Sequence, residues 1–184
     1  MEAYLNQPEL KISTINAMQA DIAAERLVKG HYWQEDKGNG CFVGCVIRGN
    51  QHSKFEDKLG IPRILARLAD TIFESLPYED SKKFSLDFLE SIKVGANLDN
   101  VWPKFAYFLL VDGEHGVIKF ARSERSKKSI QDVADMYQRK INGEIIDANR
   151  WLELRRAADA ADAARQRHFV ALAKALITFL SQAL

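Results

Sequence analysis

Two cysteines and two histidines in the first third of the chain could do chemistry: Cys41, Cys45, His52 and His31. Thiolate and imidazole are ligands that zinc prefers, so Cys41, Cys45 and His52 are candidate metal ligands. A fourth ligand would have to come from His31 or Glu56, because no second pair of cysteines follows. The alternative is that both cysteines are reduced and buried, as free cysteines commonly are. Because buried, reduced cysteines are the more common case, we expect no metal or other cofactor.

The same residues could instead form a thiol-dependent active site. Either cysteine would be the nucleophile, with His31 or His52 as the base that activates it. Gly40 and Gly44 would leave backbone N–H groups free to meet a developing oxyanion. The alternative is a glycine-rich loop packed against the core. The glycine spacing does not match a phosphate-binding fingerprint, so a nucleotide site is not expected.

Asp70 and Glu74 stand four residues apart in a segment with helical periodicity. Carboxylates at this spacing can share a metal in helical bundles. The chain has no Glu-x-x-His sequence to complete such a centre. We therefore expect both carboxylates to be solvated or paired with Arg63 and Arg67 on neighbouring turns.

Helices are the elements that must position these residues. Apolar spacing, proline starts and glycine stops predict seven to nine of them. The expected helical segments are 8–29, 61–76, 84–92, 101–109, 130–141 and 148–183, with a short helix from the capping box at Ser53 to Gly60. The segment 117–121 could be a strand or a helix, and its context favours a helix. The segment from Cys41 to Ile47 is apolar and flanked by glycines, and its periodicity does not separate a short strand from buried coil. We expect an all-α, single-domain bundle with an irregular Gly/Cys loop, or short strands, at 37–50.

The last segment, 148–183, contains no glycine or proline and is dense in alanine. Alanine has the highest helix propensity, so a long helix is expected there. One continuous helix of this length would span roughly 54 Å, more than a compact domain of this size. We expect a core domain over 1–146 and an alanine-rich helix over 147–184. That helix would pack on the core, or would mediate self-association or bind a protein partner through residues 151–184.

The composition excludes several classes of protein. With 26 basic and 25 acidic residues the formal net charge is only +1, so nucleic acid is not an expected partner. No apolar run is long enough to span a bilayer, and the first residues lack the pattern of a signal peptide. Two cysteines do not make a disulfide framework. We expect a cytoplasmic protein with no membrane partner.

Two stretches resemble a family of uncharacterised proteins from bacteria, phages and integrated elements. The first runs from Tyr32-Trp33 through the core Gly40-Cys41-x-Val43-Gly44-Cys45 to the helix that carries Asp70 and Glu74. The second is Asp112-x-x-His115-Gly116 and the alanine-rich helix after it. The resemblance covers roughly residues 5–165. It implies a phage or mobile-element origin and assigns no functional residue.

The turn at Gly143-Glu144, followed by Trp151 and alanine repeats, is also similar to a helical family described as immunity proteins. This second similarity covers only the last third of the chain. Taken together, these features predict a non-enzymatic protein-interaction module of phage or mobile-element type. The alternative is a small metal-binding protein or thiol-dependent enzyme that uses Cys41, Cys45 and His52.

Overall fold

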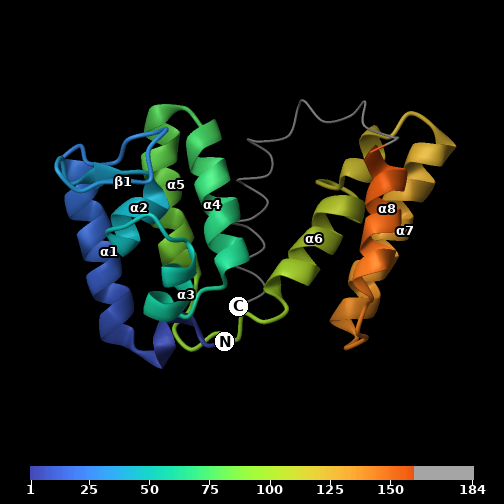
Figure 1. The fold of residues 1–184 in the computed structure, drawn as a ribbon, viewed down its shortest axis with the longest axis horizontal. Helices are drawn as coiled ribbons and strands as arrows, with labels where there is room; N and C mark the ends of the chain where they lie inside the picture. The colour runs from blue at the N-terminus through green and yellow to red at the C-terminus, as the bar shows by residue number, and fades with distance from the viewer. Residues whose placement is uncertain (160–184) are drawn as a thin grey trace. The chain divides into compact units, whose positions relative to one another are not determined.

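The computed structural model describes residues 1–159, with side chains up to residue 153, and this part of the chain is mostly helical (Figure 1). It contains eight α-helices and a single two-stranded sheet. The all-α fold predicted from the sequence is therefore confirmed. The described residues fall into two compact units, 1–99 and 100–159.

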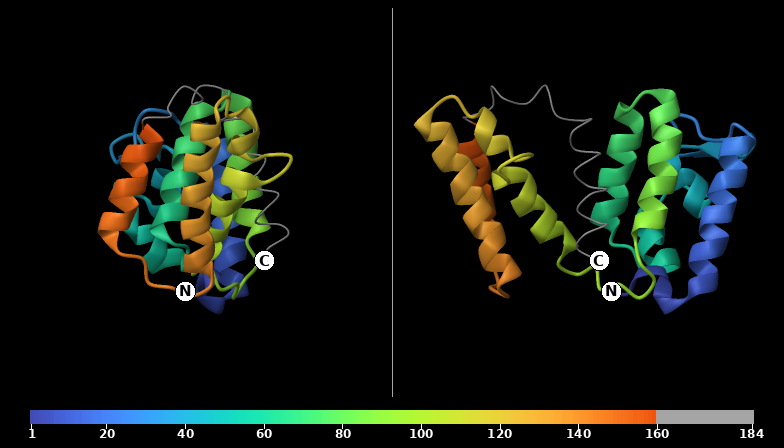
Figure 2. Two further views of the ribbon diagram at one scale, coloured as in Figure 1. Left: turned by 90° about the vertical axis from the view of Figure 1, so that its right-hand side faces the viewer. Right: turned by 180° about the vertical axis from the view of Figure 1, so that it is seen from behind.

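The first unit contains five helices, two short strands and a one-turn 3-10 segment. In chain order these elements are η1 (Ala3–Asn6), α1 (Pro8–Ala23), β1 (Trp33–Gln34), β2 (Asn39–Gly40), α2 (Phe42–Ile47), α3 (Ser53–Leu59), α4 (Arg63–Ser75) and α5 (Tyr78–Ser91). Helix α5 lies between α1 and α4, and both figures show this order from opposite sides (Figures 1 and 2). Helix α2 contacts α1, α3 and α4.

Aromatic side chains fill the core of the first unit. The Phe42 ring lies 6.1 Å from Phe55 and 5.6 Å from Phe88, both in edge-on geometry. All three rings are fully buried. The hydroxyl of buried Tyr4 donates to the carbonyl of Leu89, which fixes the N-terminal turn to α5. Edge-on aromatic contacts add specific geometry to the burial that holds α2 in place.

Helix α1 is shorter than the sequence predicts, because it ends at Ala23 rather than near residue 29. Glu25 adopts a positive φ of 53° and turns the chain out of the helix. The segment that follows pairs with β2: Gly40 N–H donates to the Arg26 carbonyl, and Val28 N–H donates to the Gly40 carbonyl. This tertiary pairing replaces the last turns of the expected helix.

Our prediction for the Gly/Cys segment, residues 37–50, is wrong in its details. Residues 39–40 do form a short strand, antiparallel to β1, but residues 42–47 form helix α2 rather than strand or coil. The helix is six residues long and ends at Arg48, which adopts a left-handed conformation. Local periodicity could not reveal so short a helix, since almost every residue in it is buried.

The second unit is built from α6 (Val101–Val111), η2 (Val117–Phe120), α7 (Glu124–Ile141) and α8 (Ala148–Asp159). Helices α6 and α7 form the main contact, and α7 also contacts α8. Tyr137 on α7 touches Trp102 at 6.4 Å and Trp151 at 4.8 Å between ring centroids. Residues 117–120 form a single 3-10 turn where a helix was expected over 117–121.

Two predictions about the C-terminal part fall mostly outside the described residues. The long helix expected over 148–183 is described as far as Asp159, and the interaction role of 151–184 stays a prediction. In the described part of the chain, each helix is too short or too polar to cross a membrane.

Candidate functional site

The N-terminus of α2 places Cys41 inside the first unit. Cys41 is the N-cap residue of α2, and its Sγ accepts a hydrogen bond from the backbone N–H of Gly44 at 3.4 Å. The residue is 1% exposed. A side chain that caps a helix satisfies one of the backbone donors that the helix leaves unpaired. The cap therefore fixes the position of the thiol.

Gly40 and Gly44 allow the segment before β1 to lie directly on this helix start. A Cβ atom at Gly44 would lie 1.5 Å from the carbonyl oxygen of Tyr32, and one at Gly40 would lie 2.0 Å from the same oxygen. The backbone N–H of Cys41 donates to the carbonyls of His31 and Tyr32 at 2.7 and 3.0 Å. These glycines are needed for close backbone packing, because no side chain fits there.

Helix α4 brings two carboxylates to the same thiol. Asp70 and Glu74 lie one helical turn apart, and one ligand atom from each lies within 4.8 Å of the others and of Cys41 Sγ. Our prediction that these carboxylates are solvated or paired with arginines is wrong. Asp70 is 7% exposed, and Glu74 accepts from the backbone N–H of Gly30 through both oxygens, at 3.1 and 3.0 Å.

His52 contacts this group through Asp70. The Nε2 atom of His52 lies 3.2 Å from Asp70 Oδ2, and the imidazole is only 13% exposed. The Tyr32 ring packs edge-on against the imidazole, with 4.9 Å between ring centroids. Thus His52 is placed to orient the carboxylate rather than the thiol.

The second carboxylate oxygen, Asp70 Oδ1, is buried and has no conventional hydrogen-bond partner among the described residues. The Cys41 thiol also interacts with the Asp70 carboxylate, and this interaction contributes to the raised pKa of the thiol. A thiol is only a weak donor. A buried carboxylate oxygen without a hydrogen-bond partner is costly, and a bound cation would offset that cost.

Electrostatics argue against Cys41 as an unassisted nucleophile. Burial raises the pKa of the Cys41 thiol far above its ordinary value, and the Asp70 charge raises that pKa further. Burial also raises the pKa of Glu74, although the N–H of Gly30 opposes this effect. Reactive cysteines sit in electropositive surroundings, which is the opposite arrangement. A bound cation would reverse this field and stabilise the thiolate.

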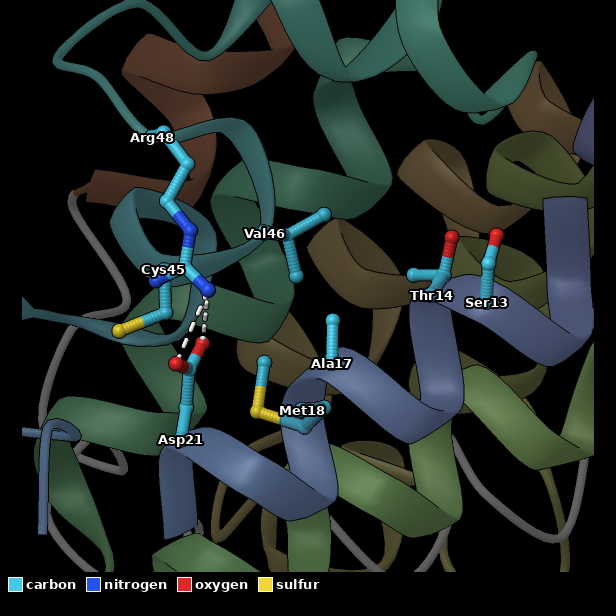
Figure 3. Close-up of a pocket in the computed structure, with 8 residues that line it drawn as sticks. All are labelled: Ser13, Thr14, Ala17, Met18, Asp21, Cys45, Val46 and Arg48. Carbon is cyan, nitrogen blue, oxygen red and sulfur yellow. Dashed lines mark hydrogen bonds and ion pairs between the residues drawn. The ribbon is translucent and has the colours of Figure 1, made fainter. Parts of the chain in front are cut away.

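Cys45, the other cysteine, belongs to a different environment. Its Sγ lies 3.4 Å from the Gly40 carbonyl oxygen, and the side chain lines a pocket between α1 and α2 beside Asp21 and Arg48 (Figure 3). Burial is the main cause that raises the pKa of Cys45 to about 12. His31 is exposed, and its backbone carbonyl rather than its ring contacts Cys41. The structure thus brings Cys41 and His52 to Asp70, while Cys45 and the His31 ring lie outside the group of ligand atoms.

Asp70 and Glu74 are the two residues of this group for which the sequence did not predict a metal-binding role. The sequence predicts an apolar stripe made of Ile61, Ile64, Leu65, Leu68, Ile72 and Leu76. Most of it is buried, but Ile64 is 40% exposed. The buried face also includes Ala66, Ala69 and Phe73, which lie beside the expected stripe. Asp70 follows Ala66 by four residues and precedes Phe73 by three, which places it on that face. This spacing was the available signal.

We name the group formed by Cys41, Asp70, Glu74 and His52 the thiol–carboxylate cluster. It joins α2, the turn after α2, and α4, and each of its members is buried or half-buried. A role for the cluster rests on geometry and chemistry, since the chain is similar to no known family model, curated protein or solved structure.

Proposed function

We propose that this protein binds a divalent zinc ion at the thiol–carboxylate cluster, with Cys41, Asp70 and Glu74 as the ligands. The observation that carries the proposal is the convergence of the three ligand atoms within 4.8 Å of one another. In addition, one buried oxygen of the Asp70 carboxylate lacks a hydrogen-bond partner among the described residues. Buried charge is costly unless it is paired or coordinates a metal. A cation between the three atoms would meet that requirement.

The chemistry of the ligands favours zinc over other divalent ions. Carboxylates alone would suit magnesium, calcium or manganese, whereas a thiolate selects softer ions. Zinc accepts sulfur at about 2.3 Å and oxygen at about 2.0–2.2 Å in tetrahedral geometry, which sets neighbouring ligand atoms roughly 3.5 Å apart. The cluster would have to contract slightly from its present spacing. The half-exposed side chain of Glu74 is the ligand with most freedom to move.

His52 would act as an outer partner of the site. Its Nε2 contacts Asp70 Oδ2, and the other oxygen of that carboxylate would be available to the proposed ion. Outer partners of this kind orient metal ligands and tune their affinity. Three protein ligands leave the fourth tetrahedral position to water, an arrangement typical of catalytic rather than structural zinc sites.

This proposal develops the alternative interpretation of the sequence and changes its ligand set. Cys41 stays, His52 becomes an outer partner, and Cys45 is replaced by the two carboxylates of α4. The interaction role over residues 151–184 remains a separate prediction, because that segment lies largely outside the described residues.

Zinc titration of the reduced apoprotein against a chromophoric chelator tests the proposal. We expect one equivalent of zinc to bind. Loss of an outer partner typically lowers metal affinity by about 10- to 100-fold. Cys41→Ser and Asp70→Asn each remove a ligand, so each should weaken zinc binding by more than this. Cys45→Ser is the matched control, since it removes the other buried thiol of the same helix.

Three results would contradict the proposal. The first is that the folded wild-type protein binds no zinc. The second is that Cys45→Ser lowers the affinity as much as Cys41→Ser does. The third is that affinity is unchanged in Asp70→Asn. Circular dichroism of each variant separates loss of the site from loss of the fold.

A further inference from the structure

A second feature of the first unit, separate from the proposed zinc site, is a pocket between α1 and α2 (Figure 3). Its volume is about 170 Å³. Apolar cavities of roughly 150 Å³ hold a molecule the size of benzene. The pocket therefore has room for a small metabolite-sized molecule.

An ion-paired group with a net positive charge lies at one end of the pocket, where Asp21 and Arg48 belong to the lining and Arg26 does not. The carboxylate of Asp21 is 1% exposed and pairs with both Arg26, at 3.1 Å, and Arg48, at 2.8 Å. Two guanidinium groups on one carboxylate leave one positive charge in excess. Among the hydrogen bonds of the described residues, Arg48 uses only Nη2. Its Nη1 group is left to donate a charge-assisted hydrogen bond to an incoming oxyanion.

The backbone at Arg48 is held in an unfavourable conformation. Arg48 follows the last residue of α2 with φ 51° and ψ 55°, a left-handed conformation that is unfavourable for a non-glycine residue. Its guanidinium also lies over the Trp33 ring, 5.0 Å from the centroid. Glycine would be the ordinary residue at this helix end. The ion pair and the ring contact therefore hold an arginine, at some cost, where its side chain lines the pocket.

The rest of the lining is apolar in the middle and hydroxylated at the far end. Ala17 and Val46 face the centre of the pocket, and the hydroxyls of Ser13 and Thr14 lie on the side away from Arg48 (Figure 3). Both hydroxyls donate to the Leu10 carbonyl, at 3.0 and 2.7 Å. Their oxygen lone pairs can still accept from a ligand.

We propose that the α1–α2 pocket binds a small organic carboxylate that carries a hydroxyl or amino group at its other end. Arg48 takes the carboxylate, Ala17 and Val46 contact the short carbon skeleton, and Ser13 and Thr14 accept from the distal donor. Hydroxy acids and amino acids of a few carbon atoms fit this order of groups.

Nuclear magnetic resonance titration with sodium 4-hydroxybutyrate, which carries its hydroxyl at the end opposite the carboxylate, tests the proposal at constant ionic strength. We expect saturable shifts of the backbone amides of α1 and α2 around the pocket, with a dissociation constant of roughly 1 mM or tighter. The corresponding amide, 4-hydroxybutyramide, has the same shape without the charge and should bind at least about tenfold more weakly. Arg48→Ala should abolish binding.

A second pair of variants keeps the test decisive if Arg48→Ala does not fold. Ala17→Leu places a larger side chain in the pocket and should abolish the 4-hydroxybutyrate shifts. Ala20→Leu makes the same substitution on an exposed position of the same helix outside the pocket lining, and should leave binding unchanged. Shifts that do not saturate, that are equal for the amide, or that survive in Ala17→Leu would overturn the proposal.

Discussion

The imidazole Nε2 of His52 lies 3.2 Å from Asp70 Oδ2, and an oxygen of the same carboxylate lies within 4.8 Å of Cys41 Sγ. The histidine therefore contacts the carboxylate rather than the thiol. In a thiol-dependent enzyme the imidazole contacts the nucleophile and the carboxylate orients the imidazole. The order of groups in this protein is instead the one expected of a metal ligand, Asp70, held by an outer partner.

Replacing His52 should therefore affect both stability and zinc affinity. His52→Ala removes the imidazole that contacts Asp70 and should lower the free energy of unfolding by about 1–3 kcal/mol. It should also weaken zinc binding by about 10- to 100-fold. His52→Gln keeps an N–H donor and should recover part of both losses. Urea unfolding and chelator competition measure the two effects, and equal affinity in all three proteins would contradict the outer-partner role.

Zinc affinity should rise with pH. The pKa of Cys41 lies far above its ordinary value, so the thiol of the apoprotein is protonated near neutral pH. Coordination requires the thiolate, and binding must release that proton. We expect the association constant to increase about tenfold per pH unit between roughly pH 6 and pH 8. A pH-independent constant, measured in buffers that do not bind zinc, would argue against thiolate coordination.

The apoprotein should lose stability in alkali through its buried thiols. Burial raises the pKa of Cys45 from its ordinary value of 9.0 to about 12, so the folded state holds a proton that the unfolded state releases. This contribution is complete below pH 9 and falls by about 1.4 kcal/mol for each pH unit above it. Cys45→Ser should show a shallower decline between about pH 9 and pH 11. The measurement is urea unfolding with a chelator and a reductant present.

Substituting Gly44 should disrupt the start of α2. In Gly44→Ala the new Cβ would lie 1.5 Å from the Tyr32 carbonyl oxygen, and backbone must move to relieve that overlap. We expect a loss of more than about 3 kcal/mol in the free energy of unfolding. Gly49→Ala is the control, because nothing lies within 4 Å of its added Cβ, and it should change stability by about 0.5 kcal/mol or less. Similar losses in both variants would show that the packing of Tyr32 on Gly44 is unimportant.

Helical periodicity in the sequence was sufficient to predict most of the fold. Proline signals located α4 closely, since Pro62 and Pro77 flank it, whereas α5 begins at Tyr78, well before the expected start at residue 84. Helix α1 ends early for a reason outside its own sequence, namely the pairing of residues 26–28 with Gly40. Helix α2 was missed because a six-residue buried helix has no polar face from which to read a period.

What the sequence by itself determined was an all-helical chain in which Cys41 and His52 stand near glycines that permit close packing. Only the tertiary structure decided that α4 turns Asp70 and Glu74 towards Cys41, and that Cys45 faces the pocket with Asp21 and Arg48. The physical reason is that a helix with a broad apolar face can rotate about its axis by one residue and still bury apolar side chains. Packing against α2 and α5 selects the rotation, and with it the side chains that meet.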